Sequence, residues 1–250
     1  MPTVGVGDID VYYEIHGEGP PLVFIGGLGV DLTVFAPFTD LLARSFRVLT
    51  FDNRGAGRTD KPDAPYSIPM MAQDTLGLMD ALGMARANVV GVSMGGRIAM
   101  ELAAEHPARI DRLVLISTAA TGTGRLRMSL PARILALAKR LHLLRGAGEI
   151  QRQPHYAHHH QLTAGTTYDG TERLPAISAP TLILHARRDR SMKPAAALAT
   201  RVGIRDSEIE FFRGGHMFFM LTQRDAVAAR VEDFLQDWRD RRWPSTLAQI

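Results

Sequence analysis

The sequence predicts an α/β protein with a mostly parallel sheet and helices on both faces. Short, largely apolar runs recur along the chain and are typical of strands that are buried on both sides. These runs lie at residues 22–25, 47–51, 88–92, 112–116 and 181–184, with a weaker one at 207–212. Segments with helical periodicity separate the runs, and this alternation is typical of parallel sheets whose crossover helices cover both faces.

The first predicted element is a hairpin formed by residues 4–6 and 10–15, which are rich in β-forming residues and separated by Gly7-Asp8. Ser67 and Pro194 occupy positions that are favourable at the start of a helix. The helices expected between the later strands lie at residues 35–46, 70–82, 96–105 and 194–202.

A last helix is expected near the C-terminus, where Thr222 and Asp225 approximate a capping box. Apolar residues then recur at helical spacing, namely Val227, Val231, Phe234, Leu235 and Trp238. This spacing predicts an amphipathic helix.

One long segment interrupts the alternation, because residues 119–174 contain no convincing strand pattern. The segment includes an amphipathic basic stretch at 129–145 and a polar stretch with four histidines. A structureless loop of this length is uncommon in a compact domain, so we expect at least two helices in it. The sequence therefore predicts a core of residues 1–118 and 175–250, and a helical cap at 119–174 inserted between two core strands.

The composition is that of an ordinary globular protein, since 46% of the 250 residues are hydrophobic and 22% are charged. The net charge of +3 does not predict a nucleic-acid partner, because neutralising phosphates needs a concentrated basic face. The apolar runs are far shorter than a membrane span, and the N-terminus lacks the features of a signal peptide. The chain has no cysteine, so disulfides and thiolate chemistry are excluded. We expect no membrane partner and a cytoplasmic location.

The main chemical signal is the motif Gly91-Val92-Ser93-Met94-Gly95, which follows the strand at 88–92 and precedes the helix at 96–105. A nucleophile on a sharp strand-to-helix turn crowds the residues two positions away on either side, and only small residues fit there. The bare pattern has a high false-positive rate. Its position between a buried strand and a helix favours Ser93 as a nucleophile.

A serine hydroxyl needs a general base, and the base needs an orienting group. The order Ser…Asp…His that is typical of this turn is met by Asp189, just past the strand at 181–184, and by His216, in a glycine-rich loop past the next strand. Both fall at the carboxyl edge of the sheet, where open α/β folds build their sites. The arginines at 187, 188 and 190 are expected to favour ionised Asp189, and a carboxylate there would orient the imidazole of His216.

Each of these residues also has a structural interpretation. Asp189 could cap the helix that begins near Pro194, and His216 could be an ordinary loop residue. All three together, in this order and topology, favour catalysis. The competing acids Asp206, Glu208 and Glu210 lie before or within the preceding strand.

A serine nucleophile also requires an oxyanion hole. The amide of Met94, directly after Ser93, is the first candidate donor. The second is expected in the loop after the strand at 22–25, where we favour the Leu28 amide over that of Gly27. Met217 and Phe218, beside His216, could line the substrate pocket or pack in the core.

Together these motifs resemble the α/β-hydrolase superfamily over residues 10–240. The motifs are Gly26-Gly27-Leu28-Gly29, Asp52-Asn53-Arg54-Gly55-Ala56-Gly57, Gly91-Val92-Ser93-Met94-Gly95-Gly96, Asp189 and Gly215-His216. Within the superfamily they are most similar to 3-oxoadipate enol-lactonases and related small-ester hydrolases. Haloalkane dehalogenases and epoxide hydrolases of the superfamily use an aspartate where this chain has Ser93. The family usually has His-Gly in place of Gly26-Gly27, so the loop here is expected to be more mobile or supported differently.

The residues and the resemblance predict a cofactor-independent serine hydrolase that cleaves a small carboxylic ester or lactone. No metal is expected, because the four histidines are adjacent on one segment without a carboxylate at a spacing that completes a site. They are His155, His158, His159 and His160. Two alternatives stay open: the fold could serve as a ligand receptor or for non-hydrolytic biosynthetic chemistry, or it could hydrolyse a carbon–carbon bond. The sequence does not predict an oligomeric state.

Overall fold

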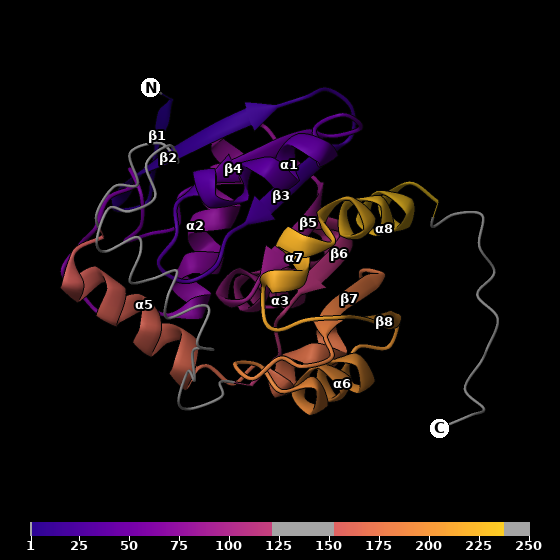
Figure 1. Ribbon diagram of the computed structural model, residues 1–250. Helices are drawn as coiled ribbons and strands as arrows, with labels where there is room; N and C mark the ends of the chain where they lie inside the picture. The colour runs from indigo at the N-terminus through magenta and orange to yellow at the C-terminus, as the bar shows by residue number, and fades with distance from the viewer. Residues whose placement is uncertain (1, 122–152, 238–250) are drawn as a thin grey trace, which may run out of the picture.

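The computed structural model describes residues 2–121 and 153–237, and within them lies an eight-stranded sheet (Figure 1). The strands are β1 (Thr3–Val6), β2 (Ile9–His16), β3 (Pro21–Ile25), β4 (Arg47–Phe51), β5 (Ala87–Val92), β6 (Ile110–Ile116), β7 (Thr181–Ala186) and β8 (Ser207–Phe212). Their order across the sheet is β1-β2-β4-β3-β5-β6-β7-β8. β2 is antiparallel to both β1 and β4, and every other neighbouring pair is parallel. The predicted mostly parallel sheet is therefore confirmed.

Helices connect the strands. They are α1 (Ala36–Leu42), α2 (Ile68–Ala81), α3 (Met94–Glu105), α5 (His155–Thr167), α6 (Pro194–Gly203), α7 (Phe218–Thr222) and α8 (Arg224–Asp237). Short 3₁₀ turns add η1 (Leu32–Phe35), η2 (Pro107–Arg109) and η3 (Thr171–Ala176).

The sheet separates two hydrophobic cores. In β3, Val23 and Ile25 pack into the core that includes side chains of α2, α3 and α6. Leu22 and Phe24 pack into the opposite core, with side chains of α1, α7 and α8. Successive side chains of a strand point to opposite faces, so a strand buried on both faces must be apolar throughout. This packing explains the continuous apolar runs, and it confirms that helices cover both faces.

The observed helices α1 and α2 agree with the predicted ones to different degrees. The helix predicted at 35–46 is shorter, because the chain first forms η1 and then α1, which ends at Leu42. Ser67 caps α2 as predicted, since its hydroxyl accepts a hydrogen bond from the Met70 amide at 3.2 Å.

The capping box predicted for the last helix is wrong. The Thr222 hydroxyl donates to the Phe218 carbonyl at 3.0 Å, within the short helix α7. α8 begins at Arg224, so Thr222 ends one helix instead of starting the next. The apolar face of α8 is buried as predicted, at Val227, Val231, Phe234 and Leu235.

The described part of the chain between β6 and β7 contains α5 and η3, and a β-bridge pairs Thr121 with Asp169. Figure 1 shows α5 outside the layers formed by the sheet and its flanking helices. The basic stretch predicted at 129–145 lies outside the described residues. None of the helices in residues 2–121 and 153–237 combines the length and the apolar character needed to cross a bilayer.

Arg54, in the loop after β4, is a buried cation that joins two distant segments. Its guanidinium donates to Asp74 on α2 at 2.8 and 2.7 Å, and to Asp8, between β1 and β2, at 3.0 and 2.7 Å. The side chain of Asp74 is 11% exposed and that of Asp8 is 67% exposed. Burial raises the pKa of Asp74, and the guanidinium counteracts this effect. The ion pair with Asp74 therefore fixes the start of the loop after β4.

The substitution Arg54→Met is expected to lower the free energy of unfolding by about 3–5 kcal/mol, because it leaves the Asp74 carboxylate buried without its partner. Asp8→Asn is expected to cost less than about 1 kcal/mol, since that carboxylate is mostly exposed. Urea denaturation of both variants and the wild type measures the difference. Equal losses would contradict the buried pair as the dominant contact.

Candidate active site

Ser93 lies on the turn between β5 and α3, and its backbone has φ 55° and ψ −114°. A positive φ is unfavourable for a residue with a side chain and costs about 1–3 kcal/mol unless the surroundings enforce it. Here the Ser93 amide donates to the Ile116 carbonyl at 2.9 Å, and the Thr118 hydroxyl donates to the Ser93 carbonyl at 2.7 Å. The buried strand β6 and the residues after it therefore hold the turn.

The glycines around Ser93 are required by close packing, as the motif predicts. A Cβ atom on Gly91 would lie 2.5 Å from the Gly95 carbonyl oxygen, and a Cβ atom on Gly95 would overlap the carbonyl oxygen of Ile25. Real Cβ atoms do not approach so closely, so larger residues would push β3, β5 and α3 apart. The sharp turn at Ser93 thus depends on glycine on both sides.

The structure brings Ser93, His216 and Asp189 together in one chain of contacts. Ser93 Oγ lies 3.1 Å from His216 Nε2, and His216 Nδ1 lies 2.7 Å from Asp189 Oδ2. Because the carboxylate accepts from Nδ1–H, Nε2 is the acceptor for the serine hydroxyl. Ser117, directly after β6, donates its hydroxyl to the His216 carbonyl at 2.6 Å and so holds the histidine loop.

Asp189 is fixed mainly by backbone amides. Its Oδ1 accepts from the amides of Ser191 and Met192, both at 2.8 Å, while Oδ2 faces His216. The Asp189 side chain makes no ion pair with Arg187, Arg188 or Arg190 within the described residues, so the arginine contribution expected from the sequence stays a prediction.

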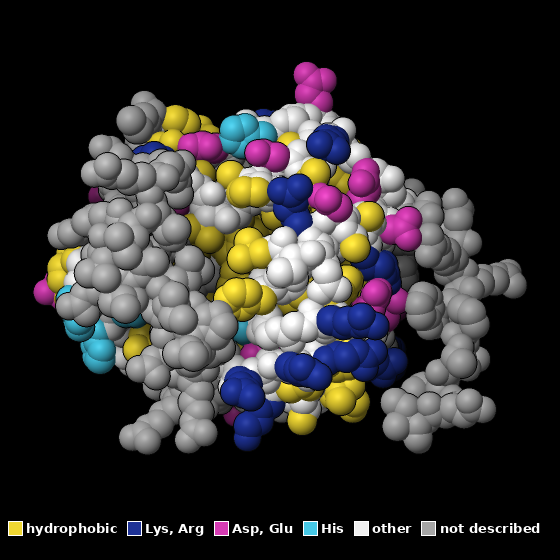
Figure 2. Space-filling model, viewed as in Figure 1, with side chains coloured by type: hydrophobic (Ala, Val, Ile, Leu, Met, Phe, Trp, Pro, Cys, Tyr) yellow, Lys and Arg dark blue, Asp and Glu magenta, His cyan; other side chains and the backbone are white. Residues whose placement is uncertain are grey.

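The neighbouring arginines instead extend into solvent. Arg187, Arg188 and Arg190 are exposed, and Arg187 lies over the Phe211 ring at 5.8 Å from its centroid. Figure 2 shows Lys and Arg side chains gathered over the region that Figure 1 assigns to β7, β8 and α6.

His185, on β7, is a buried neighbour of Asp189 that was not selected from the sequence. Its Nε2 lies 3.0 Å from the Met192 carbonyl and 3.6 Å from Asp189 Oδ2. Burial lowers the pKa of His185, which favours the neutral ring. Asp189 therefore has a second imidazole beside it, in addition to that of His216.

The candidate oxyanion donors surround Ser93. Met94 is the first residue of α3, where an amide has no acceptor within the helix. A Cβ atom on Gly27 would lie 3.5 Å from Ser93 Cβ, so the loop after β3 passes directly beside the serine. The Gly29 amide donates to Gln161 Oε1 at 2.9 Å and is already occupied. Leu28 and Gly27 therefore stay the candidates for the second donor.

The loop after β3 has its own supports, which fits the expectation that it is held differently from loops with His-Gly. Asn53 Nδ2 donates to the Gly26 carbonyl at 3.0 Å, and Gln161 on α5 holds Gly29. These contacts join the loop to the segment after β4 and to the segment between β6 and β7. Neither Asn53 nor Gln161 was selected from the sequence, because their partners are distant in the chain.

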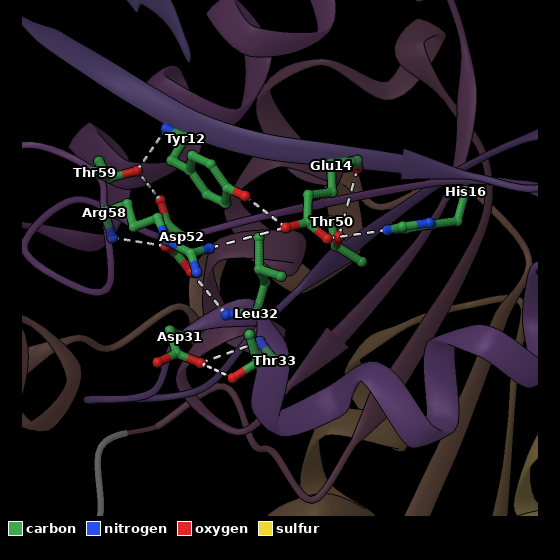
Figure 3. Close-up of polar contacts among 10 residues, drawn as sticks. All are labelled: Tyr12, Glu14, His16, Asp31, Leu32, Thr33, Thr50, Asp52, Arg58 and Thr59. Atoms are coloured by element: carbon green, nitrogen blue, oxygen red, sulfur yellow. Dashed lines mark hydrogen bonds and ion pairs between the residues drawn. The ribbon is translucent and has the colours of Figure 1, made fainter. Parts of the chain in front are cut away.

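Asp52, directly after β4, ties the loop after β3 to the loop after β4 (Figure 3). Its buried carboxylate accepts from the amides of Leu32 and Arg58, both at 2.7 Å. Thr59 donates its hydroxyl to the Asp52 carbonyl at 2.7 Å. Burial raises the pKa of Asp52, and the two amide contacts oppose this rise. The Asp-x-Arg-Gly motif thus acts as a structural support beside the site.

The two predicted pocket residues differ in their packing. Met217 is partly buried and packs against the core beneath α8, and Phe218 is partly exposed at the start of α7. The next residue, Phe219, is fully buried and stacks on Phe212 at 5.2 Å between centroids. Contact of Met217 or Phe218 with substrate stays a prediction.

Two of the competing acids and two of the histidines of α5 have other partners. Glu208 and Glu210 both accept hydrogen bonds from Arg230 on α8. On α5, His158 Nδ1 lies 3.0 Å from Gln153 Oε1, and His160 Nε2 lies 3.1 Å from Asp63. In the part of the chain that the structure describes, no group of three or more His, Asp or Glu side chains is arranged to hold a metal ion.

Comparison with known proteins identifies the fold family. The family described as the α/β hydrolase fold matches residues 20–141. A protein named carbamate hydrolase RutD, from Azorhizobium caulinodans, is 32% identical over 253 residues, which cover 89% of this chain and 94% of that relative. A poly(3-hydroxyalkanoate) depolymerase from Ectopseudomonas oleovorans is 29% identical and covers 88% of this chain and 86% of its own. The crystal structure of the enol-lactonase from Burkholderia xenovorans LB400 is 29% identical and superposes with a TM-score of 0.81 over 94% of this chain and 99% of that one. Sequence, sheet topology and relatives agree that this chain belongs to the α/β-hydrolase fold family.

Proposed function

We propose that this protein is a serine hydrolase that cleaves a small carboxylic ester or lactone without a cofactor. The observation that carries the proposal is the pair of contacts that join Ser93 Oγ to His216 Nε2 at 3.1 Å and His216 Nδ1 to Asp189 at 2.7 Å. A nucleophile within hydrogen-bond reach of a base, which is oriented in turn by a carboxylate, is the arrangement that acyl transfer requires.

In the proposed reaction, His216 Nε2 accepts the proton of Ser93 Oγ while the oxygen attacks the carbonyl carbon. The ionised Asp189 stabilises the imidazolium that forms. Collapse of the tetrahedral intermediate breaks the bond to the leaving oxygen, which takes the proton from His216. Water then attacks the acyl-enzyme by the same route and releases the acid and free Ser93.

The negative charge that develops on the carbonyl oxygen needs fixed donors. We assign this role to the amides of Met94 and Leu28, with Gly27 as the alternative to Leu28. Loss of one such donor typically costs about 10²–10³ in kcat. The supports around Asp52, Asn53 and Gln161 hold the loop that would carry the second donor.

The substrate class rests on the relatives and on the segment between β6 and β7. The solved relative named an enol-lactonase and the relative named a polyester depolymerase both favour ester or lactone cleavage. We propose that residues 119–174 form a cap over the site, because α5 contacts loops on its rim. The relative named a carbamate hydrolase makes carbamates the comparison substrate in any screen.

The first test is Ser93→Ala, which is expected to lower kcat by about 10⁵–10⁶-fold because it removes the attacking oxygen. Turnover of p-nitrophenyl acetate and a fluorophosphonate label on Ser93 measure the effect, and circular dichroism checks the fold. Retained turnover in the variant would refute the assignment. A wild-type protein that retains a small molecule but takes no label and shows no turnover would indicate a receptor.

Asp189→Asn is expected to lower kcat by about 10⁴-fold with little change in KM. The amide can still accept from Ser191 and Met192, so the loop should keep its shape, while His216 loses the carboxylate that orients and stabilises it. Steady-state kinetics of the variant measure kcat and KM separately. A fall in kcat of tenfold or less would show that another residue orients His216.

A screen of straight-chain esters, ring-size lactones and matched carbamates defines the substrate class. Esters or lactones of short chain length are expected to give the highest kcat/KM. Turnover of carbamates alone, or of a vinylogous diketone alone, would contradict the ester and lactone assignment and leave the nucleophile assignment intact.

A further inference from the structure

We propose that Gln161, on α5, is a positioning residue for the oxyanion loop (residues 26–29). The segment between β6 and β7 then sets catalytic geometry in addition to covering the site. This inference rests on the proposed serine hydrolase function. It concerns a residue that touches neither Ser93 nor the reacting carbonyl, and its effect passes through the backbone of the loop.

Gln161 makes hydrogen bonds through both atoms of its side-chain amide. The residue is fully buried, and its Oε1 accepts from the Gly29 amide and from Gln153 Nε2, both at 2.9 Å. Its Nε2 donates to the Arg54 carbonyl at 2.7 Å. One side chain therefore joins the loop after β3 to the loop after β4. A buried polar group is costly to leave unpaired, so these bonds hold firmly.

The orientation of the amide is determined by its partners. Two donors, Gly29 N–H and Gln153 Nε2, face the same oxygen, and an acceptor, the Arg54 carbonyl, faces the nitrogen. Gln153 is oriented in turn, because its Nε2 also donates to the Gly55 carbonyl at 2.8 Å, so its Oε1 accepts from His158 Nδ1 at 3.0 Å. A flipped Gln161 would oppose donor to donor and acceptor to acceptor. The network thus has one arrangement.

The side chains around Gln161 lie close enough to the oxyanion loop to restrict its backbone at Gly29. Gly29 has φ +68°, and a Cβ atom on it would lie 2.9 Å from His158 Nδ1 and 3.2 Å from Gln153 Oε1. The side chains of His158, on α5, and of Gln153, two residues before α5, therefore lie directly against the loop. On the other side, Asn53 holds the Gly26 carbonyl. The candidate donors Gly27 and Leu28 lie between these two supported ends.

α5 is itself fixed to the helix that follows Ser93. Arg97, on α3, donates to the Gly165 carbonyl near the end of α5, and to the carbonyls of Ala119 at 3.2 Å and Thr121 at 2.9 Å. Burial lowers the pKa of Arg97 to about 10, so it stays charged near neutral pH. A Cβ atom on Gly165 would lie 3.7 Å from Met94 Cγ. One helix therefore lies beside Met94, which carries one proposed donor, and holds Gly29, which is next to the other.

The test is Gln161→Met, which keeps the volume of the side chain and removes its hydrogen bonds. A displaced donor weakens only the transition state, so kcat is expected to fall by about 10- to 100-fold while KM changes by less than about threefold. The affinity for a trifluoromethyl ketone, whose serine adduct carries an oxyanion, should fall in parallel with kcat/KM. Hydrogen exchange at the Gly29 amide should accelerate in the same variant.

The matched control is Tyr168→Phe, which removes another hydrogen bond of the same segment. Tyr168 donates to Glu101 on α3 at 2.8 Å, and within the described residues its hydroxyl makes no hydrogen bond to the oxyanion loop. This variant is expected to lower Tm while kcat stays within about twofold of wild type. Gln161→Glu keeps the acceptor for the Gly29 amide, and its protonated carboxyl can donate to the Arg54 carbonyl. It should therefore recover most of the kcat that Gln161→Met loses, which keeps the proposal testable if the methionine variant folds poorly.

The outcomes separate the two proposals. Wild-type kcat in Gln161→Met, with a loss of Tm like that of Tyr168→Phe, would show a structural role only and overturn the inference. A rise in KM alone, or a glutamate variant as impaired as the methionine variant, would overturn it as well. Wild-type protein with neither turnover nor a labelled Ser93 would overturn the proposed function and this inference with it.

Discussion

The backbone turn at Ser93 is the constraint on which the rest of the site depends. Its positive φ is tolerated because β5 before it and α3 after it are buried in the centre of the molecule, and because Gly91 and Gly95 let the chain segments approach closely. The hydroxyl therefore belongs to the rigid core and not to a mobile loop. Catalytic geometry built on such elements is more precise than geometry built on loops.

The parallel topology then brings distant residues to this turn. β5, β6, β7 and β8 are neighbours in the sheet and parallel, so the residues that follow them share one edge. Ser93 follows β5, Ser117 follows β6, Asp189 follows β7 and His216 follows β8. Each contributes a different part: the proposed nucleophile, a support for the histidine loop, the carboxylate and the base. The site is thus a consequence of strand order.

A second set of contacts holds the other half of the site. Asp52 and Asn53, after β4, fix the loop after β3, and Gln161 fixes it from the segment between β6 and β7. These supports are buried polar groups with their partners satisfied, which makes their arrangement unique. The loop that has Gly26-Gly27 where the family usually has His-Gly is therefore supported by side chains from two other segments.

The sequence alone determined the fold class, the strands, the strand-to-helix turn at Ser93 and the chain order in which Asp189 and His216 follow it. Apolar periodicity, glycine spacing and motif order are all visible in the sequence without any long-range contact. The prediction of the N-terminal cap of the last helix was wrong, because Thr222 lies at the end of α7 and not at the start of α8. Only the tertiary structure decided the supports of the site: the amides that hold Asp189, the buried His185 beside it and the link from Gln161 to Gly29. Gln161 lies 132 residues from Gly29, and no local pattern records such a contact, since it exists only once the sheet and the inserted helix have packed together.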